Sequence, residues 1–238
     1  VPVRLRDPAA LEPGIAHAVQ VARLLAAVVP GGDRRQGPFI VIADDNATDP
    51  MRTLNAGRIT PEMALPVDEW AGYAGRAEAV ARAVREEVGL YSVFHHHSAG
   101  WVETPSEIER FLALTDPDLL GLIFDTGHYL FGAGESGPSE VEILDRWRDR
   151  IWYIHFKDAD LELARVAKAE NWDYFQALRA GIFSELGKGA VNFPGVVRWL
   201  LDHGYDGWGV VEQDILPGMG TPKESARRNR DYLAALGL

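Results

Sequence analysis

Residues 151–158 read IWYIHFKD, an apolar run that ends abruptly in a histidine, a lysine and an aspartate. A short run of this kind, almost wholly apolar, is typical of a parallel β-strand that is covered on both faces. We therefore predict a strand over Ile151–His155, with Lys157 and Asp158 just beyond its carboxyl end. Side chains in that position are the ones from which α/β barrels build their active sites.

The same pattern occurs three more times in the second half of the chain. YSVF at 91–94 is followed by HHH, GLIF at 121–124 by DTGH, and WGVV at 208–211 by EQD. Five of the seven histidines lie in these clusters. One cluster has little meaning by itself, but four in series predict a single site, assembled at one rim of a barrel.

Strands and helices are predicted to alternate along the chain. Upstream of the four runs, FIVIA at 39–43 indicates another buried strand, and Val1–Leu5 indicates a short one. Apolar residues at helical spacing predict helices over Pro8–Val29, Val67–Val88, Pro105–Leu114, Ser139–Arg148, Phe193–His203 and Pro222–Leu236. Gly89 is placed to end the second helix, and Thr104 with Glu107 forms a T-x-x-E capping box for the third.

This repetition predicts the α/β class, either as a (β/α)8 TIM barrel or as an open doubly wound sheet. No G-x-G-x-x-G phosphate loop follows a strand, and polar clusters end successive strands, so the barrel is favoured. We expect residues 1–238 to form a single domain. Because about six strands are visible and the chain begins at Val1 within a strand remnant, we expect one or two N-terminal βα units to lie outside this sequence.

Composition narrows the classes of function. The net charge of −11 argues against a surface built for nucleic acid. No apolar run reaches the roughly 18–20 residues that span a bilayer, and the N-terminus shows no signal peptide. We therefore expect a cytoplasmic protein without nucleic-acid or membrane partners. A homo-oligomer is compatible with this composition. Since there are no cysteines, any metal must be held by nitrogen and oxygen ligands.

Carboxylates and imidazoles at the strand ends are predicted to hold a divalent ion, either Mn²⁺, Co²⁺ or Mg²⁺, with Zn²⁺ also compatible. Asp125 and His155 end their strands, and Glu212 follows two valines, where an uncompensated carboxylate would be costly to bury. Glu103, in the loop after the triple histidine, is a further candidate ligand. The alternatives are a loop cap for Asp125, a core histidine for His155 and a helix N-terminal carboxylate for Glu103.

The remaining polar side chains of the clusters are candidates for proton transfer. Alternation along a strand sends His95 and His97 to one side and His96 to the other. We expect His95, His97 and His128 to act as acid–base groups, because histidine titrates near neutrality. Lys157 would stabilise an oxyanion. The alternatives are an exposed turn for the triple histidine and a solvated pair of Lys157 with its neighbouring aspartate.

In this order the motifs resemble the xylose-isomerase-like TIM-barrel superfamily of sugar isomerases and epimerases, and within it the inosose dehydratase family. The resemblance covers residues 39–216. It rests on VIAD at 41–44, DEW at 68–70, HHH and VET at 95–104, TDP at 115–117, DTGH at 125–128, HFKD at 155–158, GIF at 181–183, GKGAVNF at 187–193 and GWGVVEQD at 207–214. The set is specific to this group of families, whereas a single piece such as VIAD is not.

The resemblance implies a set of four metal ligands, Glu, Asp, His and Glu, from the ends of four successive strands. Asp125, His155 and Glu212 match the last three, while His95 stands where the first glutamate is expected. Either His95 is a ligand, or Glu103 supplies the carboxylate from the loop. Epimerases of the superfamily use the first and last glutamates as an acid–base pair, so the departure favours a dehydratase with histidine acid–base groups.

The function predicted is therefore that of a metal-dependent lyase that removes a proton next to a ketone, most closely an inosose (2-keto-myo-inositol) dehydratase. The base would be His95, His97 or Glu212, and an imidazolium, His128 or His97, would protonate the departing hydroxyl. The substrate would be a small polyol or keto-sugar. The alternatives are a keto-sugar isomerase or epimerase on the same metal, a non-catalytic metal- or sugar-binding barrel, and an endonuclease-IV-like phosphodiesterase, which the charge disfavours.

Overall fold

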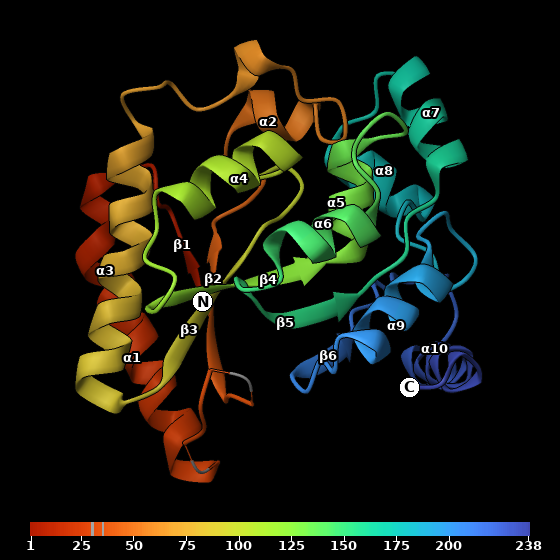
Figure 1. Ribbon diagram of the computed structural model, residues 1–238. Coiled ribbons are helices and arrows are strands. Elements are labelled where there is room, and N and C mark those ends of the chain that lie inside the picture. Colours follow the sequence, from red (N-terminus) through yellow and green to blue (C-terminus); the bar gives the residue numbers. More distant parts are fainter. Residues whose placement is uncertain (30, 35) are drawn as a thin grey trace.

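The computed structural model, which describes residues 1–29, 31–34 and 36–238, contains one sheet of six strands. The strands are β1 (Pro2–Val3), β2 (Phe39–Asp44), β3 (Tyr91–His95), β4 (Leu120–Asp125), β5 (Ile151–Phe156) and β6 (Trp208–Val211). They lie in chain order, and each pairs in parallel with the next. Every connection is therefore a crossover, and the predicted βα repeat is confirmed (Figure 1).

The six predicted helices are present; five are slightly shorter than expected, and α10 has its predicted bounds. They are α1 (Leu11–Val28), α3 (Trp70–Val88), α4 (Pro105–Ala113), α6 (Glu140–Trp147), α9 (Phe193–Asp202) and α10 (Pro222–Leu236). Gly89 ends α3 with φ 82, in the left-handed region, and both bonds of the Thr104–Glu107 capping box are formed. Residues Pro8–Ala10 form a 3-10 turn directly before α1, and the Asp7 side chain accepts from the N–H of Ala9 at its start.

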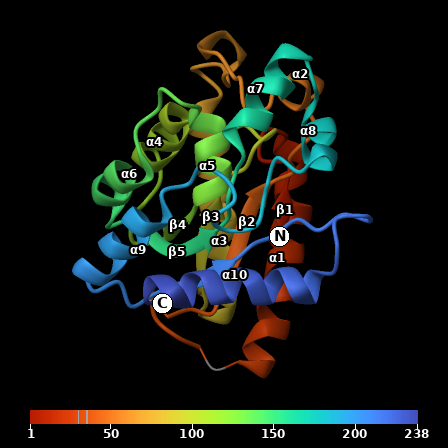
Figure 2. The same ribbon diagram turned by 90° about the vertical axis from the view of Figure 1, so that its right-hand side faces the viewer.

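Four further helices lie where the sequence indicated loops. They are α2 (Pro50–Leu54), α5 (Thr126–Ala133), α7 (Leu161–Ala169) and α8 (Tyr174–Ala180), and a 3-10 turn covers Pro61–Met63. Each of the four is short, and the side chain of an aspartate caps its first turn. Such helices depend on capping and tertiary packing more than on a long apolar period. Helices α2, α7 and α8 gather at one end of the molecule (Figures 1 and 2).

The sheet is covered by helices on its outer face. Helices α1 and α3 lie side by side on one flank, and α9 and α10 flank the other end of the sheet (Figures 1 and 2). Side chains alternate as expected: Phe94 and Phe124 belong to the large core beneath the helices, while Val93 and Ile123 form an inner cluster with Trp152. All six residues of β4 are buried, which accounts for its uninterrupted apolar sequence.

Strands β1 and β6 are the two edges of the sheet. Six strands among the described residues are two fewer than the eight of a closed barrel, so the fold corresponds to a barrel that lacks some of its units. The inner side of β6 is open: Trp208 is 59% exposed, and its indole Nε1 donates to the carbonyl oxygen of Gln36 at 2.6 Å. Within the described residues, none of the helices combines the length and the apolar character that a bilayer crossing requires.

Candidate metal centre

Four side chains converge where β3 to β6 end. His95, Asp125 and His155 belong to β3, β4 and β5, and Glu212 follows β6 directly. In the register, Asp125 is paired with His155, so these two side chains lie at one level of the sheet. His95 is paired with Ile123, two residues before Asp125, and Glu212 follows two residues after Val210, the partner of His155. One ligand atom from each of the four residues lies within 4.8 Å of the other three. The predicted convergence of the strand ends is therefore present.

Three atoms face one another at this point: Nε2 of His95, Oδ2 of Asp125 and Nδ1 of His155. The first two have no hydrogen-bond partner among the described residues. Oδ2 of Asp125 lies 3.6 Å from Nε2 of His95 and 3.4 Å from Nδ1 of His155. Oε2 of Glu212 completes the group, 3.9 Å from His95 and 2.5 Å from His155. Leaving buried polar atoms unpaired is costly. Two imidazole nitrogens and two carboxylate oxygens around one point fit a divalent cation.

Asp125 serves two purposes with its two oxygens. Oδ1 accepts from the backbone N–H of His128 at 2.7 Å and thereby caps α5, while Oδ2 faces the centre. The loop-cap alternative and the ligand interpretation are therefore compatible with each other. Burial by itself would raise the pKa of Asp125, but the surrounding histidines and Lys157 outweigh it and hold the pKa well below its usual range. The carboxylate is thus ionised and ready to bind a cation.

Glu212 is held in place by a buried lysine. Lys157 is 1% exposed, and its Nζ lies 3.1 Å from Oε1 of Glu212 and 2.7 Å from Oδ2 of Asp214. Burial opposes ionisation of Glu212, but His155 and Lys157 lower its pKa to about 2. For His155, burial acts to lower the pKa, yet the carboxylates of Asp125 and Glu212 raise it to about 9. The expected oxyanion-stabilising lysine is therefore paired with the carboxylates of the site.

Asp158 does not pair with Lys157. Its carboxylate accepts from the backbone N–H groups of Ala159, Gly187, Gly189 and Val191. The alternative that Lys157 and Asp158 form a solvated pair is therefore wrong, because both side chains are buried and have separate partners. Asp158 instead holds the loop that contains GKG against the end of β5.

His97 and His128 lie together beside the cluster. Their ring centroids are 3.8 Å apart, and the centroid of His128 lies 5.6 Å from that of His95. Burial, followed by the neighbouring histidines, lowers the pKa of His97 to about 4 and that of His128 well below its usual value. The surroundings thus favour neutral rings at both positions, whereas the sequence led us to expect an imidazolium at one of them.

His96 points to the other face of the sheet, as alternation along β3 predicts. Its ring lies near Phe124, with centroids 6.2 Å apart, and its Nε2 accepts from the backbone N–H of Asp125 at 3.2 Å. Burial lowers the pKa of His96 to about 3, so the ring is neutral and can accept this bond. His96 therefore stabilises the end of β4 at Asp125 from the opposite face of the sheet.

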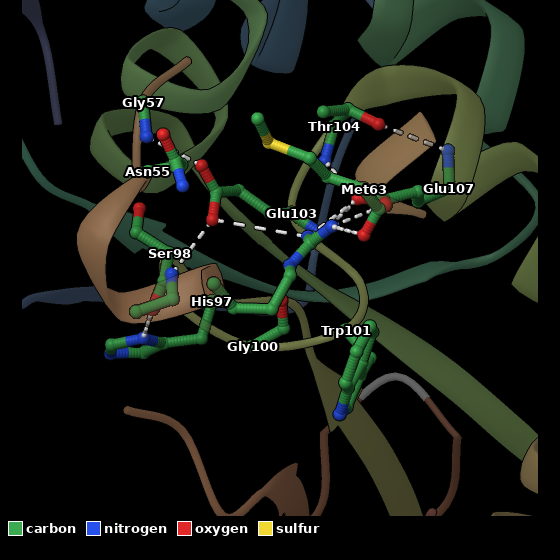
Figure 3. Close-up of polar contacts among 12 residues, drawn as sticks. Asn55, Gly57, Met63, His97, Ser98, Gly100, Trp101, Glu103, Thr104 and Glu107 are labelled. Atoms are coloured by element: carbon green, nitrogen blue, oxygen red, sulfur yellow. Dashed lines mark hydrogen bonds and ion pairs between the residues drawn. The ribbon is translucent and has the colours of Figure 1, made fainter. Parts of the chain in front are cut away.

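Glu103 is not brought to the cluster. Its Oε1 accepts from the N–H of Gly57 at 2.6 Å, its Oε2 accepts from the N–H of Ala99 at 2.7 Å, and the guanidinium of Arg52 lies 4.0 Å away (Figure 3). Both oxygens are thus used, so Glu103, expected as a candidate ligand, lies apart from the converging group, whereas His95 belongs to it. Burial raises the pKa of Glu103 to about 7.

Sequence reasoning missed Arg52, which is fully buried and joins three segments. Its guanidinium donates to both oxygens of Glu107 at 2.8 and 2.9 Å, and its Nε donates to the carbonyl oxygen of Gly100 at 2.8 Å. The carboxylate of Glu107 also accepts from the N–H of Glu103 and that of Thr104 (Figure 3). A capping-box glutamate is ordinarily at the surface, so the sequence carried no signal that this one is paired with a buried arginine.

Comparison with known sequences gives a family and several relatives. The family model described as "Xylose isomerase-like TIM barrel" matches residues 45–236. The chain is 36% identical over 168 residues to an inosose dehydratase of Lacticaseibacillus casei, covering 71% of this chain and 55% of the relative. It is 34% identical over 172 residues to an inosose dehydratase of Geobacillus kaustophilus (strain HTA426), covering 72% and 54%. The chain spans about half the length of these curated relatives.

Similar solved structures show the same fold at low sequence identity. A probable 3-DHS dehydratase, AsbF, from Bacillus anthracis superimposes with a TM-score of 0.62 at 17% identity, over 94% of this chain and 70% of that one. The IOLI protein with a bound zinc atom gives 0.59 at 14%, over 93% and 68%. An L-ribulose 3-epimerase gives 0.60 at 15%, over 94% and 66%. The family match covers most of the chain and agrees with the sheet order, so this chain belongs to the xylose isomerase-like TIM-barrel family.

Proposed function

We propose that this chain carries the active site of a divalent-metal-dependent enzyme that removes a proton next to the ketone of a small keto-polyol, as an inosose dehydratase does. The observation that carries the proposal is the convergence of His95, Asp125, His155 and Glu212, whose ligand atoms all lie within 4.8 Å of one another. The inosose dehydratases at 34–36% identity support the class of substrate and reaction.

The four converging residues would hold the ion. A mixed set of two imidazoles and two carboxylates suits Mn²⁺, Co²⁺ or Zn²⁺ better than Mg²⁺, which prefers oxygen ligands. When bound, such an ion supplies Lewis acidity that polarises a carbonyl oxygen and stabilises the negative charge that develops on it. Lys157 keeps Oε1 of Glu212 turned away from the centre, which leaves Oε2 for the ion.

The residue at the end of β3, where the resemblance implies the first glutamate ligand and this chain has His95, favours dehydration. A pair of carboxylates on opposite sides of a substrate could take a proton from one face and return it to the other, but here His95 stands at the end of β3, opposite Glu212. His97 and His128 lie next to this position and are the proposed groups for proton transfer and hydrogen bonding to substrate. We therefore propose dehydration over two-base epimerisation.

We also propose that residues 1–238 act as one domain, because a single continuous sheet joins both ends of the chain. The site is formed by residues from four successive strands, so it depends on the sheet remaining intact. A small polyol or keto-sugar is the proposed partner. The acidic surface expected from the net charge of −11 makes nucleic acid an unsuitable one.

The experiment is turnover of 2-keto-myo-inositol by the protein after removal of metal and reloading with Mn²⁺, Co²⁺ or Zn²⁺. The proposal predicts metal-dependent growth of the ultraviolet absorbance of an enone-type product. Loss of substrate with a new ketose in the NMR spectrum and no such absorbance would replace the dehydratase with an isomerase. Tight metal binding without any conversion of this substrate would overturn the proposed reaction.

A further inference from the structure

The carbonyl oxygen of Ser98 defines which nitrogen of His97 carries a hydrogen. This oxygen lies 2.7 Å from Nδ1 of His97, and a carbonyl oxygen can only accept (Figure 3). Nδ1 must therefore be the protonated nitrogen. In the neutral ring the other nitrogen, Nε2, then carries the lone pair.

The backbone N–H of Ser98 defines the opposite tautomer in His128. The backbone N–H of Ser98 donates to Nδ1 of His128 at 3.4 Å, and the Ser98 hydroxyl lies 2.9 Å from that nitrogen. A backbone N–H can only donate, so Nδ1 of His128 is the nitrogen without hydrogen. Nε2 of His128 then carries the hydrogen, and this buried atom has no partner among the described residues.

The side chain of Asn46 does not change this assignment. Its amide nitrogen lies 2.9 Å from Nδ1 of His97, where the hydrogen of that ring is already directed at Ser98. The oxygen and nitrogen of an amide exchange places when the group rotates by half a turn, and the hydrogen bonds around the group determine which orientation it takes. A backbone carbonyl has no such freedom. With its oxygen toward His97, Asn46 accepts from the same Nδ1–H.

The backbone of Ser98 is fixed by the buried network around Glu103. The next residue, Ala99, has φ 63, in the left-handed region, and its N–H donates to Oε2 of Glu103 at 2.7 Å. One residue further on, the carbonyl oxygen of Gly100 accepts from buried Arg52. The three polar groups of Ser98 thus have a defined direction relative to the two rings, and Glu103 and Arg52 provide it without touching either ring.

We propose that Ser98 is a positioning residue that sets opposite tautomers in the two histidines, so that His97 presents a lone pair on Nε2 and His128 presents an N–H on Nε2. With ring centroids 3.8 Å apart, the pair places a base beside a hydrogen-bond donor. The catalytic consequence rests on the proposed function, but the tautomers themselves do not. Neutral His128 is then a donor to a substrate oxygen and is not the imidazolium acid that the sequence led us to expect.

In this arrangement one ring serves both proton transfers of a water loss. The C–H bond next to the ketone breaks, its proton passes to Nε2 of His97, and the electron pair forms the new carbon–carbon double bond. The C–O bond breaks, and the departing hydroxyl takes the same proton from His97 and leaves as water. His128 holds a substrate oxygen through Nε2–H throughout. Both rings end in the state in which they began.

The direct test is the ring ¹⁵N NMR spectrum of protein labelled at histidine, recorded without metal and with diamagnetic Zn²⁺. Protonated and unprotonated ring nitrogens have well-separated shifts, and His97→Gln and His128→Gln assign the two rings. We expect a protonated Nδ1 in His97 and a protonated Nε2 in His128. The same tautomer in both rings, or the reverse pair, would overturn the proposal.

Ser98→Ala tests the side chain, because it removes the hydroxyl and keeps both backbone groups. We expect the signals of His128 to move toward those of a tautomer mixture while His97 is unchanged, and kcat to fall roughly 10–100-fold with KM retained. Ser98→Thr, which keeps a hydroxyl, should restore the signals, and Ser106→Ala, a surface serine, should leave them alone. An unchanged His128 spectrum in Ser98→Ala would contradict the role of the hydroxyl. Opposite tautomers in a protein that fails to convert 2-keto-myo-inositol would refute the proposed function alone.

Discussion

Nε2 of His95 faces Oδ2 of Asp125 across 3.6 Å, and within the described part of the chain neither atom has a hydrogen-bond partner. The two residues end neighbouring strands, so the sheet itself fixes their separation. Two buried polar atoms that face each other without a hydrogen bond cost the folded state stability. We interpret the pair as one side of the proposed cation site.

Asp125→Asn separates the two roles of this side chain. The amide oxygen can still accept from the N–H of His128 and cap α5, but an NH₂ group replaces the oxygen that faces the centre. We expect Mn²⁺ affinity, measured by calorimetry, to fall by more than the roughly 10–100-fold that supporting residues of metal sites cost. Asp125→Ala should lose the same affinity and also about 1 kcal/mol of stability with the cap. Mn²⁺ binding at native affinity in Asp125→Asn would contradict the ligand role.

Lys157→Gln tests whether the buried lysine fixes Glu212. Without the cation, Oε1 of Glu212 is free to rotate toward the centre, and we expect kcat on the keto-polyol to fall roughly 10–100-fold. Lys188→Gln is the matched control, because Lys188 is exposed and pairs with Glu185 at the surface. Steady-state kinetics decide between them: equal kcat values for the two variants would show that Lys157 has no part in the site.

Arg52→Met tests the buried network that anchors the loop after β3. The variant leaves the carboxylates of Glu103 and Glu107 in the interior without their cation, which costs about 3–5 kcal/mol when one partner of a buried pair is removed. Arg198→Met removes an exposed pair with Asp202 and should change the free energy of unfolding by no more than about 0.5 kcal/mol. Urea unfolding measures both. A loss below about 1 kcal/mol for Arg52→Met would be incompatible with this network.

Glu103 should make the stability of the protein depend on pH. Its pKa of about 7 lies above the ordinary 4.5 that the side chain regains on unfolding. Between these values the native state holds a proton that the unfolded chain has released. The free energy of unfolding contributed by Glu103 therefore falls as pH rises through this window, and it levels off above it.

Glu103→Gln cannot ionise, so it isolates this effect. The stability advantage of the native protein over the variant should shrink by on the order of 3 kcal/mol between about pH 5 and about pH 8. Urea unfolding at several pH values measures the advantage directly. An advantage that is constant across this range would show that the buried carboxyl keeps an ordinary pKa.

Much of the fold was predictable, because the signals are local and repeated. Pro222–Leu236 was predicted at its observed bounds, and the other long elements differ by a few residues at their ends. Helices α5 and α8 were not predicted, because each has only eight or seven residues and begins at an aspartate cap inside a motif rich in polar residues. Their stability comes from packing with distant segments, which a local pattern does not contain.

The convergence of the site was also predictable, since parallel strands place their carboxyl ends at one edge. The choice between His95 and Glu103 was not predictable, because it depends on where a loop directs a side chain. Two backbone N–H groups, of Gly57 and Ala99, hold the carboxylate of Glu103 away from the centre, and one of them comes from 46 residues upstream. The role of Ser98 depends on contacts of similar range and was not visible in the sequence.

The most direct test of the central claim is a crystal structure of the protein soaked with Mn²⁺, with anomalous diffraction data. The account predicts one anomalous peak among Nε2 of His95, Oδ2 of Asp125, Nδ1 of His155 and Oε2 of Glu212, at roughly 2.0–2.2 Å from the ligand atoms. Glu103 should remain bonded to Gly57 and Ala99. No peak at saturating Mn²⁺, or a peak coordinated by Glu103 in place of His95, would contradict it.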